Sequence, residues 1–421
     1  MSETAATPST KALAEPTVRV PGIYLAGMAL ANLGIMLAFY TPIQNLLPRL
    51  SEQIAGADGK EVALAVVLGI GVIGSVIGNP LAGALSDRTT SRFGRRRPWM
   101  LGGALLGMVA LFILPSMNTI IGLTILWLFI QFSVNASYAA LTATIPDQVP
   151  VEQRGVASGW VGLAQTLGIV LGVALVSFVV LGLTSGTYLI AILFFLLVIP
   201  FMFILKDPKL DPADRPPFHL GAFVKGFWIS PKQYPDFAWA WLARFLVALA
   251  ISMSTLYLLF YLQDHLGFSS DEAGQKQTIL IALYAFGTML TAVVGGAISD
   301  RSGKRKKFVV TSTIIVACAA LLLAFTMKFN VAVIAAVILG LGYGWYLAVD
   351  QALITQVLPA AVDRARDLGV INIANSLPQV LAPVIAAPIV TTLGGYPVLY
   401  VVTAIVGLAG AVAVLPIKSV P

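Results

Sequence analysis

The sequence predicts an all-α membrane protein whose twelve transmembrane helices form two pseudo-symmetric six-helix bundles. Three observations predict this fold class. The composition is too apolar for a water-soluble protein, twelve apolar runs are each long enough to cross a bilayer, and a motif in the first half of the chain returns in the second half.

The composition indicates that lipid is the solvent of this chain. Of its 421 residues, 58% are hydrophobic and 11% are charged, and the mean hydropathy is +0.89. A soluble protein of this length needs more polar surface. The single cysteine, Cys318, excludes a disulfide framework, and His219 and His265 are too few for a catalytic triad or a histidine-metal site. We therefore expect no enzyme, no metal and no organic cofactor, with a proton or sodium as the candidate coupling ion.

The apolar runs set the helix number and the domain organisation. A span needs about 20 apolar residues, because the bilayer core is about 30 Å thick. The predicted spans are 22–47, 63–85, 99–116, 119–145, 155–183, 187–205, 237–263, 277–299, 308–327, 331–358, 367–392 and 397–416. The predicted domains are a cytoplasmic tail 1–21, an N-terminal bundle 22–205, a cytoplasmic linker 206–235, a C-terminal bundle 236–416 and a cytoplasmic tail 417–421.

The distribution of cations predicts the orientation. Of the 26 Lys and Arg residues, 21 lie in the termini and the even-numbered loops. The opposite loops carry four: Arg49, Lys60, Lys276 and Lys328. Because cytoplasmic loops retain cations, both termini are predicted to be cytoplasmic in a multi-pass protein of the cell membrane. The formal charge of +7 is spread over these short loops, which argues against nucleic acid as a partner.

An internal repeat relates the two halves. The run GALSDR at 83–88 returns as GAISDR at 296–301, and each copy precedes a basic cluster. LAN at 30–32 likewise returns as LAR at 242–244. Two related halves with a binding site between them near the bilayer midplane are typical of secondary transporters, so the architecture itself indicates transport.

These motifs resemble the major facilitator superfamily over the whole chain. The run SDRTTSRFGRRRP at 86–98 is similar to the superfamily's signature between helices 2 and 3, in the longer form of the sucrose and glycoside-pentoside-hexuronide cation symporter branch. The run LGVINIA at 368–374, followed by Pro378 and Gln379, resembles a stretch of plant sucrose carriers.

The resemblance implies a secondary active transporter of a small polar solute, most of all a sugar or glycoside, working by alternating access with proton coupling as a hypothesis. Multidrug or lysolipid transport on the same fold and a non-transporting membrane sensor remain alternatives. The expected partners are the small-molecule substrate and the lipid bilayer, and we expect a monomer.

Two ionisable residues fall inside predicted spans, Arg244 in the seventh and Asp350 in the tenth. Charges there are costly and tend to face a cavity or a partner. We expect the two to form or approach a charge pair, with Asp350 as the proton-coupling carboxylate and Arg244 as its modulator or a substrate clamp. A purely structural brace between helices is the alternative.

Polar residues at helical spacing predict two faces of a substrate cavity, one on the fourth span and one on the eleventh. Amide side chains both donate and accept hydrogen bonds, which suits a polyhydroxylated ligand, and aromatic rings could stack on a sugar face. Hydrogen bonding between helices is the alternative role. Besides Arg244, the predicted substrate-binding residues are Asn32, Tyr40, Gln131, Asn135, Tyr138, Gln165, Tyr257, Tyr284, Trp345, Tyr346, Asn372, Asn375 and Gln379.

The repeated motif also predicts a gate at the cytoplasmic edge. A carboxylate there can accept hydrogen bonds from a neighbouring helix N-terminus and hold one closed state. The predicted gating residues are Asp87, Arg88, Arg154, Asp300 and Arg301. The basic residues Arg95 to Arg97 and Lys304 to Lys307 are expected to set topology and to contact anionic lipid.

Overall fold

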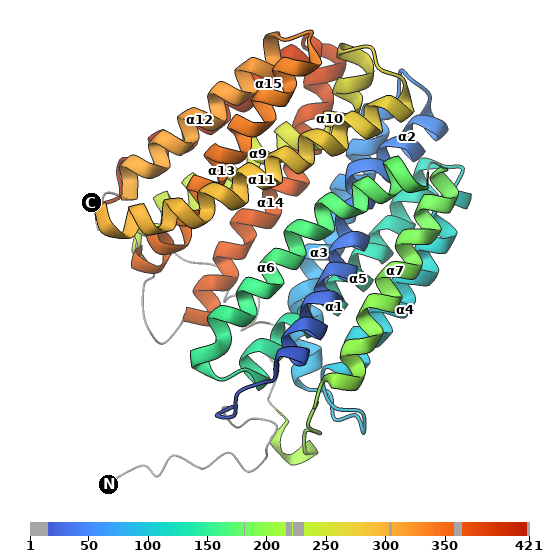
Figure 1. The fold of residues 1–421 in the computed structure, drawn as a ribbon, viewed down its shortest axis with the longest axis vertical. Coiled ribbons are helices and arrows are strands. Elements are labelled where there is room, and N and C mark those ends of the chain that lie inside the picture. Colours follow the sequence, from blue (N-terminus) through green and yellow to red (C-terminus); the bar gives the residue numbers. More distant parts are fainter. Residues whose placement is uncertain are drawn as a thin grey trace. The chain divides into compact units, whose positions relative to one another are not determined.

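The computed structural model describes residues 16–180, 182–215, 221, 231–302, 305–357 and 364–418, and every regular element in them is helical (Figure 1). Ten of the helices described are long and apolar enough to cross a membrane. The eighth and eleventh predicted spans lie in two further helices, α11 and α14. The prediction of an all-α membrane fold is confirmed.

The first half of the chain forms six long helices. They are α1 (Gly22–Thr41), α3 (Lys60–Asp87), α4 (Arg97–Ile113), α5 (Ile120–Gln148), α6 (Val151–Ala174) and α7 (Leu183–Ile204). The π-helical turn Pro42–Leu46 continues α1 into the short helix α2 (Leu47–Ala55), and another, Leu175–Val179, ends α6. Short 3₁₀ turns follow α4 (Leu114–Ser116) and the end of α7 (Pro212–Asp214).

The second half repeats this order. Its helices are α9 (Pro235–Leu256), α10 (Leu258–Phe260), α11 (Ser270–Ser302), α12 (Arg305–Phe325), α13 (Phe329–Val357), α14 (Arg364–Thr392) and α15 (Gly395–Val414), with a π-helical turn at Tyr261–His265. This π turn follows the seventh span, as the turn at Pro42–Leu46 follows α1.

The chain divides into two compact units. One comprises Met1–Leu46 and Ile70–Phe218, and the other comprises Leu47–Gly69 and His219–Pro421. Our domain boundaries placed all of 22–205 in the first bundle, whereas α2 and the first ten residues of α3 group with the second unit.

The same helix pairings occur in both units. In the first, α1 packs on α6 and α7, and α4 packs on α5 and α7 (Figure 1). In the second, α9 packs on α14 and α15, and α12 packs on α13 and α15. Helices that correspond by the sequence repeat therefore make corresponding contacts, which is the pseudo-symmetry that the repeat predicts.

Small residues set the closest helix contacts. In the second unit, Gly340 and Gly344 of α13 face carbonyl groups of Tyr284 and Thr288 in α11, with no room for a Cβ. In the first unit, Gly71 of α3 faces the ring of Trp127 in the same way. Packing between close backbones is a main source of helix association in lipid.

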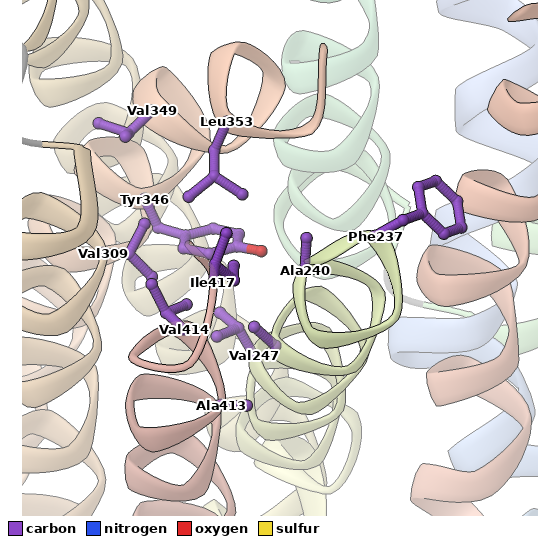
Figure 2. Close-up of a cluster of buried hydrophobic side chains, with 11 residues drawn as sticks. Phe237, Ala240, Val247, Val309, Tyr346, Val349, Leu353, Ala413, Val414 and Ile417 are labelled. Carbon is purple, nitrogen blue, oxygen red and sulfur yellow. The ribbon is translucent and has the colours of Figure 1, made fainter. Parts of the chain in front are cut away.

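One hydrophobic cluster of the second unit surrounds Tyr346. Figure 2 shows Tyr346 among Val309, Val414 and Ile417, with its hydroxyl directed toward Ala240 of α9. Four helices, α9, α12, α13 and α15, contribute to this cluster. A buried hydroxyl in so apolar a place needs a hydrogen-bond partner, and that partner is Asp350.

Candidate functional site

The amide face of α5 is present in the first unit. Gln131 and Asn135 are both buried, and Asn135 Nδ2 donates to the Gln131 side-chain oxygen at 3.2 Å and to its backbone oxygen at 2.8 Å. In the part of the chain that the structure describes, the buried Nε2 group of Gln131 has no hydrogen-bond partner. An unsatisfied buried donor is costly, so this amide is suited to a ligand acceptor.

A second polar group joins α1, α5 and α6. The Tyr40 side chain hydrogen-bonds to Gln165, and its ring meets Phe39 edge to face with centroids 4.9 Å apart. Tyr138 is close enough to Tyr40 for their hydroxyls to interact electrostatically. The structure thus brings together three of the predicted substrate-binding residues from three different helices.

Asn32 has a role between helices. Its Nδ2 donates to the backbone oxygen of Val161 in α6 at 2.8 Å, and the residue is fully buried. Hydrogen bonding between helices is the alternative role that we gave for polar residues in the spans. The buried Oδ1 atom of Asn32 accepts no hydrogen bond from the residues that the structure describes.

The two charges inside the spans form a pair in the second unit. Arg244 Nη1 of α9 lies 3.1 Å from Asp350 Oδ2 of α13, and each side chain is 6% exposed. Tyr346, one turn before Asp350, donates from its hydroxyl to Asp350 Oδ1 at 2.7 Å. Oδ1 thus accepts a hydrogen bond, whereas Oδ2 is compensated by the guanidinium charge in a contact that lacks hydrogen-bond geometry.

Stacked tyrosines approach this pair. Tyr284 stacks on Tyr343 with centroids 6.0 Å apart, and Tyr343 stacks on Tyr346 at 6.2 Å. Tyr343 was missing from our predicted site, although its position three residues before Tyr346 signalled the same face. The ring of Trp345 packs against Phe308 of α12, beside the hydrophobic cluster that contains Tyr346.

Among the other predicted substrate residues of this unit, Tyr257 makes its described hydrogen bonds away from the Arg244–Asp350 pair. The Tyr257 hydroxyl donates to the backbone oxygens of Glu61, at 3.2 Å, and Pro383, at 3.4 Å. Gln379 of α14 is half-buried. The side chains of Asn372 and Asn375 lie outside the described part of the structure.

The motif between α3 and α4 forms an ion-pair network. Arg96 donates to Asp87, to the Ser86 hydroxyl and, from Nε at 2.7 Å, to Asp147 Oδ2 at the end of α5. Arg95 pairs with the other Asp147 oxygen at 2.8 Å. Burial by itself would lower the pKa of Arg96, but hydrogen bonds and attraction from Asp147 and then Asp87 raise it above the ordinary value. Arg96 is therefore charged at every physiological pH.

Asp207, beyond the end of α7, caps α4. Its Oδ2 atom accepts from the backbone N–H groups of Arg96 at 2.7 Å and Arg97 at 2.8 Å, where a helix start has free donors. Gly94 has a φ of +95° and leaves no room for a Cβ beside the Asp207 carboxylate. The loop, α5 and the segment after α7 are thus tied together at one end of the first unit.

These contacts revise our expectation for the basic cluster. Arg95 and Arg96 are buried and paired, so they do more than mark topology. The carboxylate at a helix N-terminus is Asp207, whereas Asp87 binds Arg96. Arg154 donates to the backbone oxygens of Val149 and Pro146 and so closes the turn between α5 and α6.

The second copy of the motif is described only in part. Asp300 and Arg301 lie near the end of α11, and their side chains lie outside the part of the chain that the structure describes, as do Gly303 and Lys304 altogether. The gating assignments of Asp87, Arg88, Arg154, Asp300 and Arg301 remain predictions.

The sequence matches the family described as Major Facilitator Superfamily over residues 22–278 and 240–421. Among curated proteins, it is 29% identical over 166 residues to a general alpha-glucoside permease of Schizosaccharomyces pombe, covering 36% of this chain and 29% of the relative. It is also 65% identical over 37 residues to an uncharacterized symporter of Synechocystis, covering 9% of this chain and 7% of the relative. These alignments span less than a third of either relative.

Solved structures share the fold. Two crystal structures of nucleoside transporter NupG, one of them a point mutant, superpose with TM-scores of 0.72 and 0.73 at 14% sequence identity. Each match covers 94% of this chain and at least 98% of the other. At this identity the likeness bears on the fold alone.

Proposed function

The chain belongs to the major facilitator superfamily and is a secondary transporter, and from this premise we propose that its substrate is a sugar or glycoside. The observation that carries the proposal is the Gln131–Asn135 amide pair on α5, where Gln131 Nε2 has no hydrogen-bond partner among the described residues. Buried amides of this kind suit hydroxyl groups, which also both donate and accept.

A second polar group supports the same substrate class. Tyr40 and Gln165 join a phenol to an amide, and Tyr138 lies beside them. Aromatic rings next to hydrogen-bonding groups suit the mixed apolar and polar faces of a sugar ring. A multidrug or lysolipid carrier would gain little from buried amides, because its substrates offer few hydroxyl partners.

The partial alignment with a general alpha-glucoside permease is consistent with this choice. We propose an α-glucoside as the first substrate to test, with transport by alternating access of the two six-helix halves. Both termini would lie in the cytoplasm, as the cation distribution predicts.

Proton coupling is part of the proposal and rests on Asp350. Its carboxylate is buried between the Arg244 guanidinium and the Tyr346 hydroxyl. Protonation of Asp350 would cancel the attraction to Arg244 and release that side chain, so a proton could alter helix contacts between α9 and α13. The Asp87–Arg96–Asp147 network and the Asp207 cap would hold together the end of the first unit at which the gate is predicted.

Purified protein in liposomes tests the substrate class. Labelled α-glucosides, other disaccharides and nucleosides are offered in turn, and a dye inside the vesicles reports pH. We expect uptake of an α-glucoside, and we expect Gln131→Leu to raise KM about tenfold, since a lost hydrogen bond in a buried site costs about 1.4 kcal/mol.

Thr142→Ala is the matched control on the same helix, because the Thr142 hydroxyl donates to the backbone of its own helix at Tyr138. Its KM should equal that of the unchanged protein. Uptake of none of the sugars, together with transport of cationic drugs or lysolipids, would remove the sugar assignment.

A further inference from the structure

The helix α3 belongs to both compact units. Its residues Lys60 to Gly69 group with the second unit, and Ile70 to Asp87 group with the first. Any movement of one unit against the other must therefore bend α3 or release its first part from the second unit. What holds that first part decides how readily such a movement occurs.

A buried cation fastens the start of α3. Lys60 is only 3% exposed, and its Nζ lies 2.7 Å from Asp264 Oδ1 and 3.3 Å from Glu52 Oε1. The same ammonium lies over the ring of Phe260, 4.7 Å from its centroid. Two carboxylates therefore already balance this one positive charge.

A third carboxylate sits beside them. Tyr396 of α15 places its hydroxyl oxygen 2.8 Å from Asp264 Oδ2 and 3.2 Å from Glu61 Oε1. A phenol has one proton to donate, and Asp264 is the nearer acceptor. With an ionised Glu61, the phenol must share its one proton between two carboxylates, and Glu61 receives the longer and weaker share. With a protonated Glu61, the carboxyl group itself donates to the phenol oxygen, and both contacts are full hydrogen bonds.

The surroundings favour a neutral Glu61. The residue is 7% exposed, and an ionised Glu61 would be an excess negative charge with little access to water, next to Asp264, whose side chain is 36% exposed. Tyr257 donates to the Glu61 backbone oxygen. His265 follows Asp264 directly, and its ring stacks on Tyr261, which meets Tyr396 edge to face.

We propose that the start of α3 is a pH-sensitive latch in which Glu61 binds a proton while Lys60, Asp264 and Tyr396 hold α3 to the second unit. When α3 detaches, Glu61 enters water and releases the proton. This latch lies among the loops predicted to face away from the cytoplasm, so it responds to the pH on that side. It goes beyond the proposed sugar transport and does not depend on the substrate.

The direction of the pH effect follows from proton linkage. The latched state holds one more proton than the open state, so acid favours the latched state and alkali favours the open one. For one proton, the ratio of latched to open molecules changes by at most about tenfold per pH unit.

The test measures how often the buried start of α3 becomes exposed. In a Cys318→Ser background, Ala63→Cys places a thiol at a position that is 5% exposed in α3. Ala57→Cys, in the exposed turn before α3, reports the reactivity of a free thiol at each pH. The quantity followed is the ratio of maleimide labelling rates, position 63 to position 57, from pH 8 to pH 5.5.

We expect this ratio to fall with acidification, by up to about tenfold per pH unit. Glu61→Gln keeps a donor for Tyr396 without a charge, so its ratio should be low at every pH. Tyr396→Phe should raise the ratio throughout the range. Asp271→Asn is the control, because it removes a carboxylate that is 67% exposed and paired with Arg49. The labelling ratio of this variant should change with pH as it does in the unchanged protein.

Three outcomes would overturn the latch. One is a ratio independent of pH in the unchanged protein, including no labelling of position 63 at any pH. Another is an unaltered pH response in Glu61→Gln. The third is a response that His265→Gln abolishes, which would assign the titration to the imidazole. The assay contains no substrate, so failure of the sugar assignment and failure of the latch are separate results.

Discussion

Asp350→Asn tests the buried charge pair directly. The substitution preserves the volume of the side chain and an oxygen that can accept from Tyr346, whose hydroxyl lies 2.7 Å from the native carboxylate. What it removes is the negative charge 3.1 Å from Arg244 Nη1. The guanidinium then stays buried without that carboxylate.

The expected loss of stability follows from this geometry. Removing one partner of a buried ion pair costs about 3–5 kcal/mol, because the remaining charge has lost its compensation. Both side chains are 6% exposed, so water offers Arg244 little relief. The double variant Asp350→Asn with Arg244→Gln contains no charge at this place and should recover most of the loss.

Denaturant-induced unfolding in detergent measures these free energies for the unchanged protein, both single variants and the double variant. Asp271→Asn serves as the matched control, since Asp271 is 67% exposed and its pair with Arg49 should contribute less than about 1 kcal/mol. In liposomes, the same Asp350→Asn protein should carry substrate without the proton uptake that a pH dye detects.

Two results would refute the reasoning. Single variants that lose less than about 1 kcal/mol, with effects that simply add in the double variant, would mean that Arg244 and Asp350 do not compensate each other. Proton uptake that is unchanged in Asp350→Asn would leave the pair as a structural brace, the alternative that the sequence had left open.

Two further variants test the network and the helix packing. Arg96→Ala leaves Asp147 without the hydrogen bond from Arg96 Nε and should lower the free energy of unfolding by about 3 kcal/mol, measured by denaturant-induced unfolding in detergent. A loss below about 1 kcal/mol would show that water can replace the contacts of Arg96 with the carboxylates. Gly340→Ala drives a methyl group into the Tyr284 carbonyl oxygen and should lower the free energy of unfolding by about 1–3 kcal/mol. Gly102→Ala is the control and should be neutral, because its methyl group meets no described atom within 4 Å. Equal effects of the two substitutions would contradict the close packing of α11 and α13.

The sequence by itself determined the fold class, because lipid imposes it. Without water to satisfy backbone groups, each apolar run must become a helix, and a repeated motif must fold twice in the same way. Arg244 and Asp350 could be singled out for the same reason, since a charge in a span requires compensation. The two residues are more than a hundred positions apart in the sequence, and two helices of one unit bring them into contact, as expected for a charge pair.

Only the tertiary structure decided which polar groups meet. Tyr257 and Trp345 lie on predicted spans like Tyr346, yet they turn to a backbone carbonyl and to Phe308 instead of to Asp350. The cluster around Lys60 and Tyr396 joins positions more than three hundred residues apart. Helical periodicity places a residue on a face of its own helix, but which neighbour that face meets depends on the packing of all the helices in the unit.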